Sequence, residues 1–192
     1  MNVVSISGSP SARSRSAWLL RLAQTRLESL ATSVRWIAVR ELPPVALLRG
    51  DAAEPAIASA LQTVQRADVV LVATPIYKAA YSGLLKLLFD LLPQDGLRGK
   101  TVLPIATAGS PAHLLALDYA LKPVLSSMGA RDILTGVFAT DSQLRPHATQ
   151  GYVADDAIVD RLDRSINALG DRAFAESAPD FNTSRCLPAV GG

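Results

Sequence analysis

The chain has 192 residues, of which 49% are hydrophobic and 19% charged, a composition that favours one compact domain and excludes a disordered chain. The formal net charge of +2, with no run of four Lys or Arg residues, gives no indication of a nucleic-acid partner. The only cysteine, Cys186, cannot form an internal disulfide, which is typical of a reducing compartment. The N-terminus lacks the pattern of a signal peptide, and the longest apolar stretch, residues 69–73, is too short to cross a bilayer. We therefore expect a cytoplasmic protein without a membrane segment.

Short β-branched apolar runs alternate with segments of helical period along the chain. In chain order, the patterns predict a strand at 3–6, a helix at 19–30, a strand at 34–39, a helix at 57–64, a strand at 69–73, a helix at 84–92, a strand at 101–106, a helix at 113–128, a strand at 133–138 and a helix at 155–171.

The predicted strands are apolar on both faces and are separated by helices, which indicates an α/β fold with a parallel, doubly wound sheet. Right-handed crossovers favour the strand order 2-1-3-4-5 for a five-stranded, flavodoxin-like sheet. Ligands of such sheets bind outside the carboxyl ends of the strands, so the loops after the first, third and fourth strands are the candidate site. We expect one domain over residues 1–172 and an extended tail over residues 173–192, which are rich in Pro, Ser, Asn and Gly.

The loop after the first strand, residues 8–16, gathers four serines, two arginines and a glycine. Hydroxyls and free backbone N–H groups at a helix N-terminus, with arginine as the counter-charge, suit a phosphate group. A helix cap at Ser14 or Ser16 would account for one serine but not for the cluster. The loop lacks the later glycines of a dinucleotide-binding fingerprint and is not a Walker A loop. A terminal monophosphate therefore fits it better than a pyrophosphate.

The loops after the third and fourth strands favour a flat ligand. Residues 74–83 contain a proline, two tyrosines and small residues, which can form a wall against an aromatic ring system. Residues 107–111 are small and turn-forming, so the backbone can approach such a ring closely. Taken alone, either loop is adequately explained as a plain connection between two elements. All three loops are expected at one edge of the sheet, and together they indicate a binding site.

Three segments within residues 1 to about 143 closely resemble the NADPH-dependent FMN reductases of two-component alkanesulfonate monooxygenase systems. The segments are GSPSARSRS, ATPIYKAAYSGLLKLLFDLLP and GKTVLPIATAGSPAHLLALDYALKPVLSSMGA, of which the second and third are the specific ones. The resemblance implies that the chain uses FMN and NADPH, and that it supplies reduced flavin to a separate monooxygenase that cleaves the C–S bond of a sulfonate.

The resemblance also implies which residues bind FMN. The phosphate would be held by Ser9, Ser14, Arg15 and Ser16. The isoalloxazine ring would lie against Pro75, Ile76, Tyr77 and Lys78, with Thr107, Gly109 and Ser110 at its other edge.

The helix predicted at residues 113–128 contains Pro123, which has no N–H group to donate to the carbonyl of Tyr119. A local irregularity is therefore expected at this turn. In the resembling family an inserted aromatic residue forms a π-bulge here, at a subunit interface near the flavin, and Tyr119 matches that residue. The alternative is a proline-kinked core helix in which Tyr119 is simply packed. The resemblance implies a homo-oligomer, dimeric or tetrameric.

Hydride transfer from a nicotinamide to a flavin needs no acid–base side chain, so no catalytic residue is assigned. With two histidines and one cysteine in the chain, a metal site is not expected. Two alternatives to a flavin-releasing reductase remain open: a reductase of quinones, azo dyes or metal oxyanions that retains FMN, and a flavodoxin-type electron carrier. The sequence contains no recognisable reader of the ribose phosphate that distinguishes NADPH from NADH.

Overall fold

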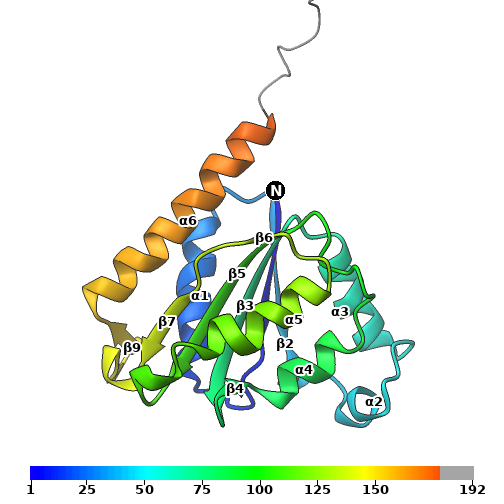
Figure 1. Cartoon of the computed structure of the whole chain (residues 1–192), viewed down its shortest axis with the longest axis horizontal. Helices are drawn as coiled ribbons and strands as arrows, with labels where there is room; N and C mark the ends of the chain where they lie inside the picture. Colours follow the sequence, from blue (N-terminus) through cyan, green and yellow to red (C-terminus); the bar gives the residue numbers. More distant parts are fainter. Residues whose placement is uncertain (178–192) are drawn as a thin grey trace, which may run out of the picture.

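A computed structural model describes residues 1–177, of which residues 171–177 are described by their backbone alone, and shows a sheet between two layers of helices (Figure 1). The strands of the main sheet are β1 (Asn2–Ser7), β2 (Ser33–Ala38), β3 (Val69–Tyr77), β4 (Ala80–Tyr81), β5 (Thr101–Ala108), β6 (Asp132–Ile133) and β7 (Val137–Thr140). A separate hairpin consists of β8 (Leu144–His147) and β9 (Gly151–Ala154). The α-helices are α1 (Arg15–Leu27), α2 (Pro44–Arg49), α3 (Pro55–Gln65), α4 (Gly83–Phe89), α5 (Lys122–Ser127) and α6 (Asp156–Ser177).

The order of the parallel strands is β2-β1-β3-β5-β6, with β7 continuing the outer position beside β5. This confirms the predicted doubly wound sheet and its order 2-1-3-4-5. β4 is a short addition that pairs antiparallel with the end of β3. All the parallel strands point the same way, so the loops that follow β1, β3, β5 and β7 lie along one edge.

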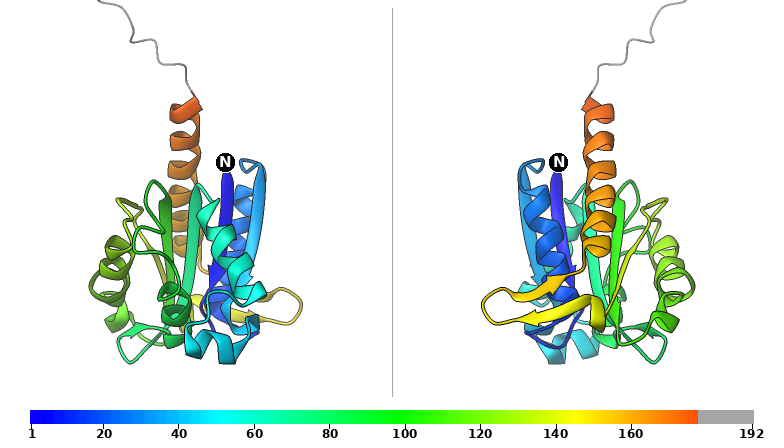
Figure 2. Two further views of the ribbon diagram at one scale, coloured as in Figure 1. Left: turned by 90° about the vertical axis from the view of Figure 1, so that its right-hand side faces the viewer. Right: turned by 90° about the vertical axis from the view of Figure 1, so that its left-hand side faces the viewer.

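Successive side chains of the central strands point to opposite faces of the sheet, and both faces are buried. Val70 and Val72 of β3 belong to the core under α2, α3, α4 and α5, whereas Leu71 belongs to the core under α1 and α6. Figure 2 shows the two helical layers on opposite sides of the sheet. Burial on both faces explains why these strands are nearly continuous apolar runs rather than alternating polar and apolar patterns.

Two predicted elements are interrupted in the structure. The helix predicted over 113–128 is divided into a 3₁₀ turn (Pro111–His113), a π-helical turn (Leu117–Leu121) and α5. The strand predicted over 133–138 is divided into β6 and β7, and at Gly136 a Cβ atom would lie 3.2 Å from the carbonyl oxygen of Pro104 on β5. Helix α4 ends at Phe89, before the predicted end at residue 92.

The C-terminal helix is longer than expected. α6 continues to Ser177, past residue 172, because neither glycine nor proline interrupts residues 171–178. The rest of the expected tail, including Cys186, lies outside the described residues. Within residues 1–177, no helix combines the length and apolar character needed to span a membrane.

Candidate functional site

The loop after β1 ends in a capped helix whose N-terminus faces the carboxyl edge of the sheet. Ser14 is the N-cap of α1, and its Oγ accepts a hydrogen bond from the N–H of Ala17 at 3.3 Å. The hydroxyls of Ser14 and Ser16 are 2.8 Å apart, and Oγ of Ser9 accepts from the N–H of Ser11 at 3.2 Å. The first turn of α1 contains no acidic residue. Its unpaired N–H groups and positive dipole end therefore favour an anion.

The loop after β3 is held in an uncommon backbone conformation. Lys78 and Ala79 have φ angles of 49° and 62°, in the left-handed region that non-glycine residues rarely adopt. The turn is fixed from behind by Thr74, whose Oγ1 donates to the carbonyl of Pro75 at 2.9 Å and accepts from the N–H of Ser82 at 2.9 Å. Tyr77 remains 52% exposed at the end of the strand. Residues other than glycine that adopt this left-handed conformation are often found at functional sites.

The loop after β5 presents backbone rather than side chains. Gly109 has only the carboxylate of Asp141 within 4 Å of where a Cβ atom would lie, at 3.9 Å. Ser110 follows as the cap of the 3₁₀ turn, and its Oγ accepts from the N–H of Ala112 at 3.3 Å. A flat group can therefore approach the main chain here without steric obstruction.

These three loops meet at one open hollow of about 260 Å³, as the topology predicts. Eight of the eleven predicted residues line it together with Ala108, namely Ser9, Ser14, Arg15, Pro75, Ile76, Tyr77, Thr107 and Gly109. Three predicted residues do not line it, namely Ser16, Lys78 and Ser110. Ser16 is fully buried beneath Ser14, so it supports the loop from below.

Sequence reasoning missed three residues of the hollow: Ser11, Arg13 and Asp141. Asp141 follows β7, a strand whose loop we did not consider, and its carboxylate lies 3.5 Å from the guanidinium of Arg15. Arg15 also donates from Nε to the carbonyl of Leu144 at 3.2 Å, and its guanidinium lies 5.3 Å from the ring centre of Tyr152. The cation of the loop is thus oriented by residues far along the chain. The ordered arrangement of parallel strands was the signal that could have revealed Asp141, because β7 ends at the same edge.

Replacing Asp141 with Asn is expected to strengthen the binding of a phosphorylated ligand by about two- to fivefold, because a negative charge beside Arg15 is removed. The effect is small because both partners are partly exposed, with side chains 30% and 48% accessible. Fluorescence titration with FMN at low and high salt measures it, and the gain should shrink at high salt. A loss of affinity would instead show that Asp141 is needed to position Arg15.

The π-helical turn lies on the same side of the molecule, before α5. Its central residue, Tyr119, is 79% exposed, whereas Leu117 and Leu121 at its two ends are buried. The irregularity predicted from Pro123 is therefore present, and the alternative in which Tyr119 is packed in the core is wrong. Leu114 and Leu115 are also exposed, so an apolar surface surrounds the tyrosine.

Comparison with known proteins decides the family. Residues 1–145 match the family described as NADPH-dependent FMN reductase. The chain belongs to this family. It is 51% identical over 144 residues to "FMN reductase (NADPH)" of Escherichia coli K12, which covers 75% of each chain. It is also 51% identical over 170 residues to "FMN reductase (NADPH)" of Pseudomonas putida KT2440, with 88% of this chain and 86% of that protein covered.

A solved structure gives the same result for the fold. The apo form of an NADH:FMN oxidoreductase superposes with a TM-score of 0.82 at 42% identity, and the match covers 93% of this chain and 91% of that chain. Membership of the NADPH-dependent FMN reductase family confirms the predicted enzyme class, an oxidoreductase, and the predicted cofactors, FMN and NADPH.

Proposed function

We propose that this NADPH-dependent FMN reductase releases its reduced flavin to a separate monooxygenase, and that the monooxygenase desulfonates alkanesulfonates. The observation that supports the first step is the convergence of three loops at one open hollow on the carboxyl edge of the sheet. Two relatives named "FMN reductase (NADPH)" at 51% identity favour NADPH as the reductant.

The residues present fit FMN. A terminal phosphate would lie at the N-terminus of α1, where Ser9 and Ser14 offer hydroxyls and Arg15 a positive charge. The isoalloxazine would lie along Pro75, Ile76, Tyr77 and Lys78 on one side, and along Thr107, Gly109 and Ser110 on the other. In this arrangement Ser16 acts through Ser14, to which it is hydrogen bonded.

Once bound, FMN would supply the redox chemistry, in which a hydride from the nicotinamide and one proton from solvent together reduce the flavin. The chain would align the two flat rings. Gly109 has no side chain, so it leaves room for a ring beside the main chain. Backbone N–H groups of residues 107–110 would stabilise negative charge on the flavin at this edge. No side chain has to donate or accept a proton in this scheme.

The shape of the hollow supports flavin as a substrate over flavin as a permanent cofactor. Its volume of about 260 Å³ is below the range of about 300–1,000 Å³ for pockets that bury most of a ligand. A small, open hollow buries less of a ligand, and for this reason we favour release over the tightly bound FMN of a quinone or azo reductase.

The purified protein is expected to oxidise NADPH only when free FMN is added. The assay follows NADPH absorbance with FMN, FAD, riboflavin or no flavin present. Addition of a sulfonate monooxygenase and an alkanesulfonate should then yield sulfite. If the protein purifies with bound flavin and reduces quinones without added FMN, it is a reductase that retains its cofactor. If it binds FMN but does not oxidise NADPH, it is an electron carrier.

We also propose that the π-helical turn lies in a subunit interface of a homo-oligomer. Replacing Tyr119 with Ala is expected to shift the protein toward smaller species in sedimentation velocity at micromolar concentration, because exposed aromatic residues dominate interface energetics. The matched control is Tyr77→Ala, which removes a second exposed tyrosine outside this turn. An unchanged sedimentation coefficient in the Tyr119 variant would exclude the turn from the interface.

A further inference from the structure

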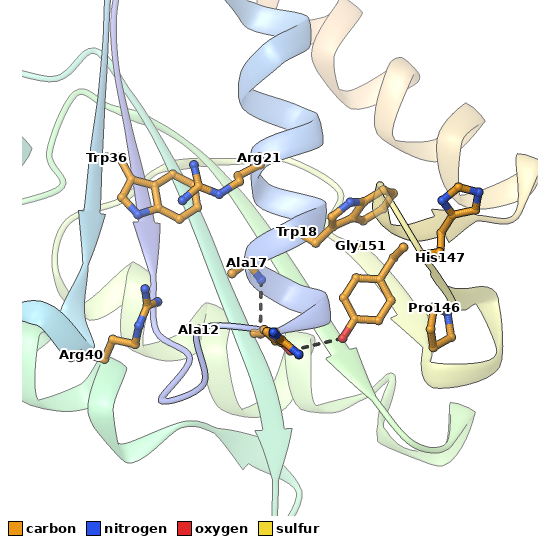
Figure 3. Close-up of a pocket in the computed structure, with 13 residues that line it drawn as sticks. Ala12, Ala17, Trp18, Arg21, Trp36, Arg40, Pro146, His147 and Gly151 are labelled. Carbon is orange, nitrogen blue, oxygen red and sulfur yellow. Dashed lines mark hydrogen bonds between the residues drawn. The ribbon is translucent and has the colours of Figure 1, made fainter.

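A second and larger hollow lies beside the candidate flavin site, on the outer side of α1. It has a volume of about 570 Å³ and is enclosed by the start of α1, by β2 and by the β8–β9 hairpin (Figure 3). Its volume is within the range of pockets that bury small organic ligands, about 300–1,000 Å³. It is lined by Ala12, Arg13, Ser14, Ala17, Trp18, Arg21, Trp36, Arg40, Pro146, His147, Ala148, Gly151 and Tyr152.

The charge of this hollow selects an anion. Three guanidinium groups line it, those of Arg13, Arg21 and Arg40, and no carboxylate among the described residues does. Arg40 forms an ion pair with Glu41, outside the hollow. Among residues 1–170, whose side chains the structure describes, neither Arg13 nor Arg21 forms an ion pair, so their charge is available to a ligand. Guanidinium groups bind phosphate with two parallel hydrogen bonds.

The walls of the hollow are aromatic, and they are fixed in place. The guanidinium of Arg21 lies 4.3 Å from the ring centre of Trp36, and Figure 3 shows the two side by side across the hollow from Trp18. Trp18 donates from Nε1 to the carbonyl of Gln150 at 2.9 Å and packs edge-on against Tyr152, with ring centres 6.0 Å apart. Flat surfaces of indole and guanidinium are suited to stack on a planar heterocycle.

The two hollows share residues. Arg13 and Ser14 line both of them, so the N-terminus of α1 is their common boundary. The hydroxyl of Tyr152 donates to the carbonyl of Arg13 at 3.2 Å and fixes the backbone at that boundary. A ligand phosphate at the N-terminus of α1 therefore has the larger hollow directly on the other side of Arg13 and Ser14.

We propose that the larger hollow binds an adenosine phosphate group, with the phosphate between Arg21 and Arg40 and the adenine against the aromatic walls. This inference rests on the proposed flavin site, because the two hollows share Arg13 and Ser14 at the N-terminus of α1. Two molecules that act with a flavin reductase contain such a group: FAD, which is FMN extended by an adenylate, and NADPH, which contains an adenosine with an additional phosphate. The chemistry recognised is the same in both.

Direct binding is measured through the protein's own fluorescence, because Trp18 and Trp36 are the only two tryptophans of the chain and both line this hollow. The probes are 5′-AMP and 2′,5′-ADP. Both are expected to change the emission of the wild type, and Arg21→Gln and Arg40→Gln should each weaken at least one of them about tenfold. Arg21→Lys, which keeps the charge but loses the planar group, should recover part of the affinity.

Arg35→Gln is the matched control. Arg35 precedes Trp36 on β2 and lines a separate hollow, so its removal changes the net charge equally without touching the proposed site. Its affinities for both probes should remain within about twofold of the wild type. Circular dichroism of each variant separates loss of binding from loss of the fold.

Steady-state kinetics then identify the source of the adenosine phosphate. If it comes from FAD, Arg21→Gln raises the KM for FAD and not that for FMN. If it comes from the pyridine nucleotide, the same variant raises the KM for NADPH more than that for NADH. If neither probe perturbs the tryptophans, or if Arg21→Gln and Arg40→Gln change no affinity and no KM, the proposal is wrong. FMN binding, followed by the flavin's own fluorescence, tests the proposed function separately.

Discussion

Replacing Gly8 with Ala is expected to lower both the stability of the protein and its affinity for FMN. Gly8 is the first residue after β1, and its N–H donates to the carbonyl of Ala73 at 2.8 Å. A Cβ atom at this position would lie 2.7 Å from Cβ of Leu85, which is fully buried in α4. The loop and the helix therefore have to move apart. Overpacking of this kind costs about 1–3 kcal/mol of unfolding free energy.

The displacement also moves the hydroxyls and N–H groups that we assign to the phosphate. Shifts near 1 Å at a binding site reduce its efficiency by on the order of tenfold to a hundredfold. Urea unfolding and FMN titration measure the two effects. The matched control is Gly83→Ala at the start of α4, where no atom lies within 4 Å of a new Cβ. That variant should be as stable as the wild type or slightly more stable. Wild-type FMN affinity in Gly8→Ala would contradict the proposed location of the phosphate.

Replacing Arg15 with Gln is expected to reduce the affinity for FMN by tenfold or more while leaving riboflavin within about twofold. The reason is that a charge-assisted hydrogen bond contributes about 1.5–3 kcal/mol, and about 1.4 kcal/mol corresponds to a factor of ten in affinity. Riboflavin has the same ring system without the phosphate, so it is the ligand control.

The matched protein control is Arg26→Gln. Arg26 lies on the same helix, its side chain is also 30% accessible, and it pairs with Asp163 of α6 away from the hollow. Its replacement should leave the affinity for both flavins unchanged. An equal loss for FMN and riboflavin in Arg15→Gln would show that the residue supports the loop and does not bind the phosphate.

The layers and the strand order could be predicted from the sequence because the signals were strong and local. Residues 69–73 are apolar at every position, as expected of a central strand that helices cover on both faces. The strand order alone predicts the edge of the sheet at which these loops lie. Ser9, Pro75 and Thr107 line one hollow because each lies at the carboxyl end of a neighbouring parallel strand.

Other features could not be predicted because they depend on contacts between distant residues. The β8–β9 hairpin has only one buried residue, Leu144, so no alternating apolar pattern marks it. It is held by Trp18 and Tyr152, whose partners lie more than 130 positions away. The π-helical turn, by contrast, was predicted from Pro123 and a resemblance. Between β6 and β7, Gly136 lies close to β5, where a Cβ atom would be 3.2 Å from the carbonyl oxygen of Pro104, and the sequence alone does not reveal this approach.

The hairpin also determines when the site can form during translation. The loop of residues 8–16 leaves the ribosome well before the carbonyl of Leu144 and the ring of Tyr152, which orient Arg15. The guanidinium of Arg15 therefore cannot be oriented until the hairpin has been synthesised. A truncated chain that ends before the hairpin would retain the central strands but would lack an oriented guanidinium at the phosphate position.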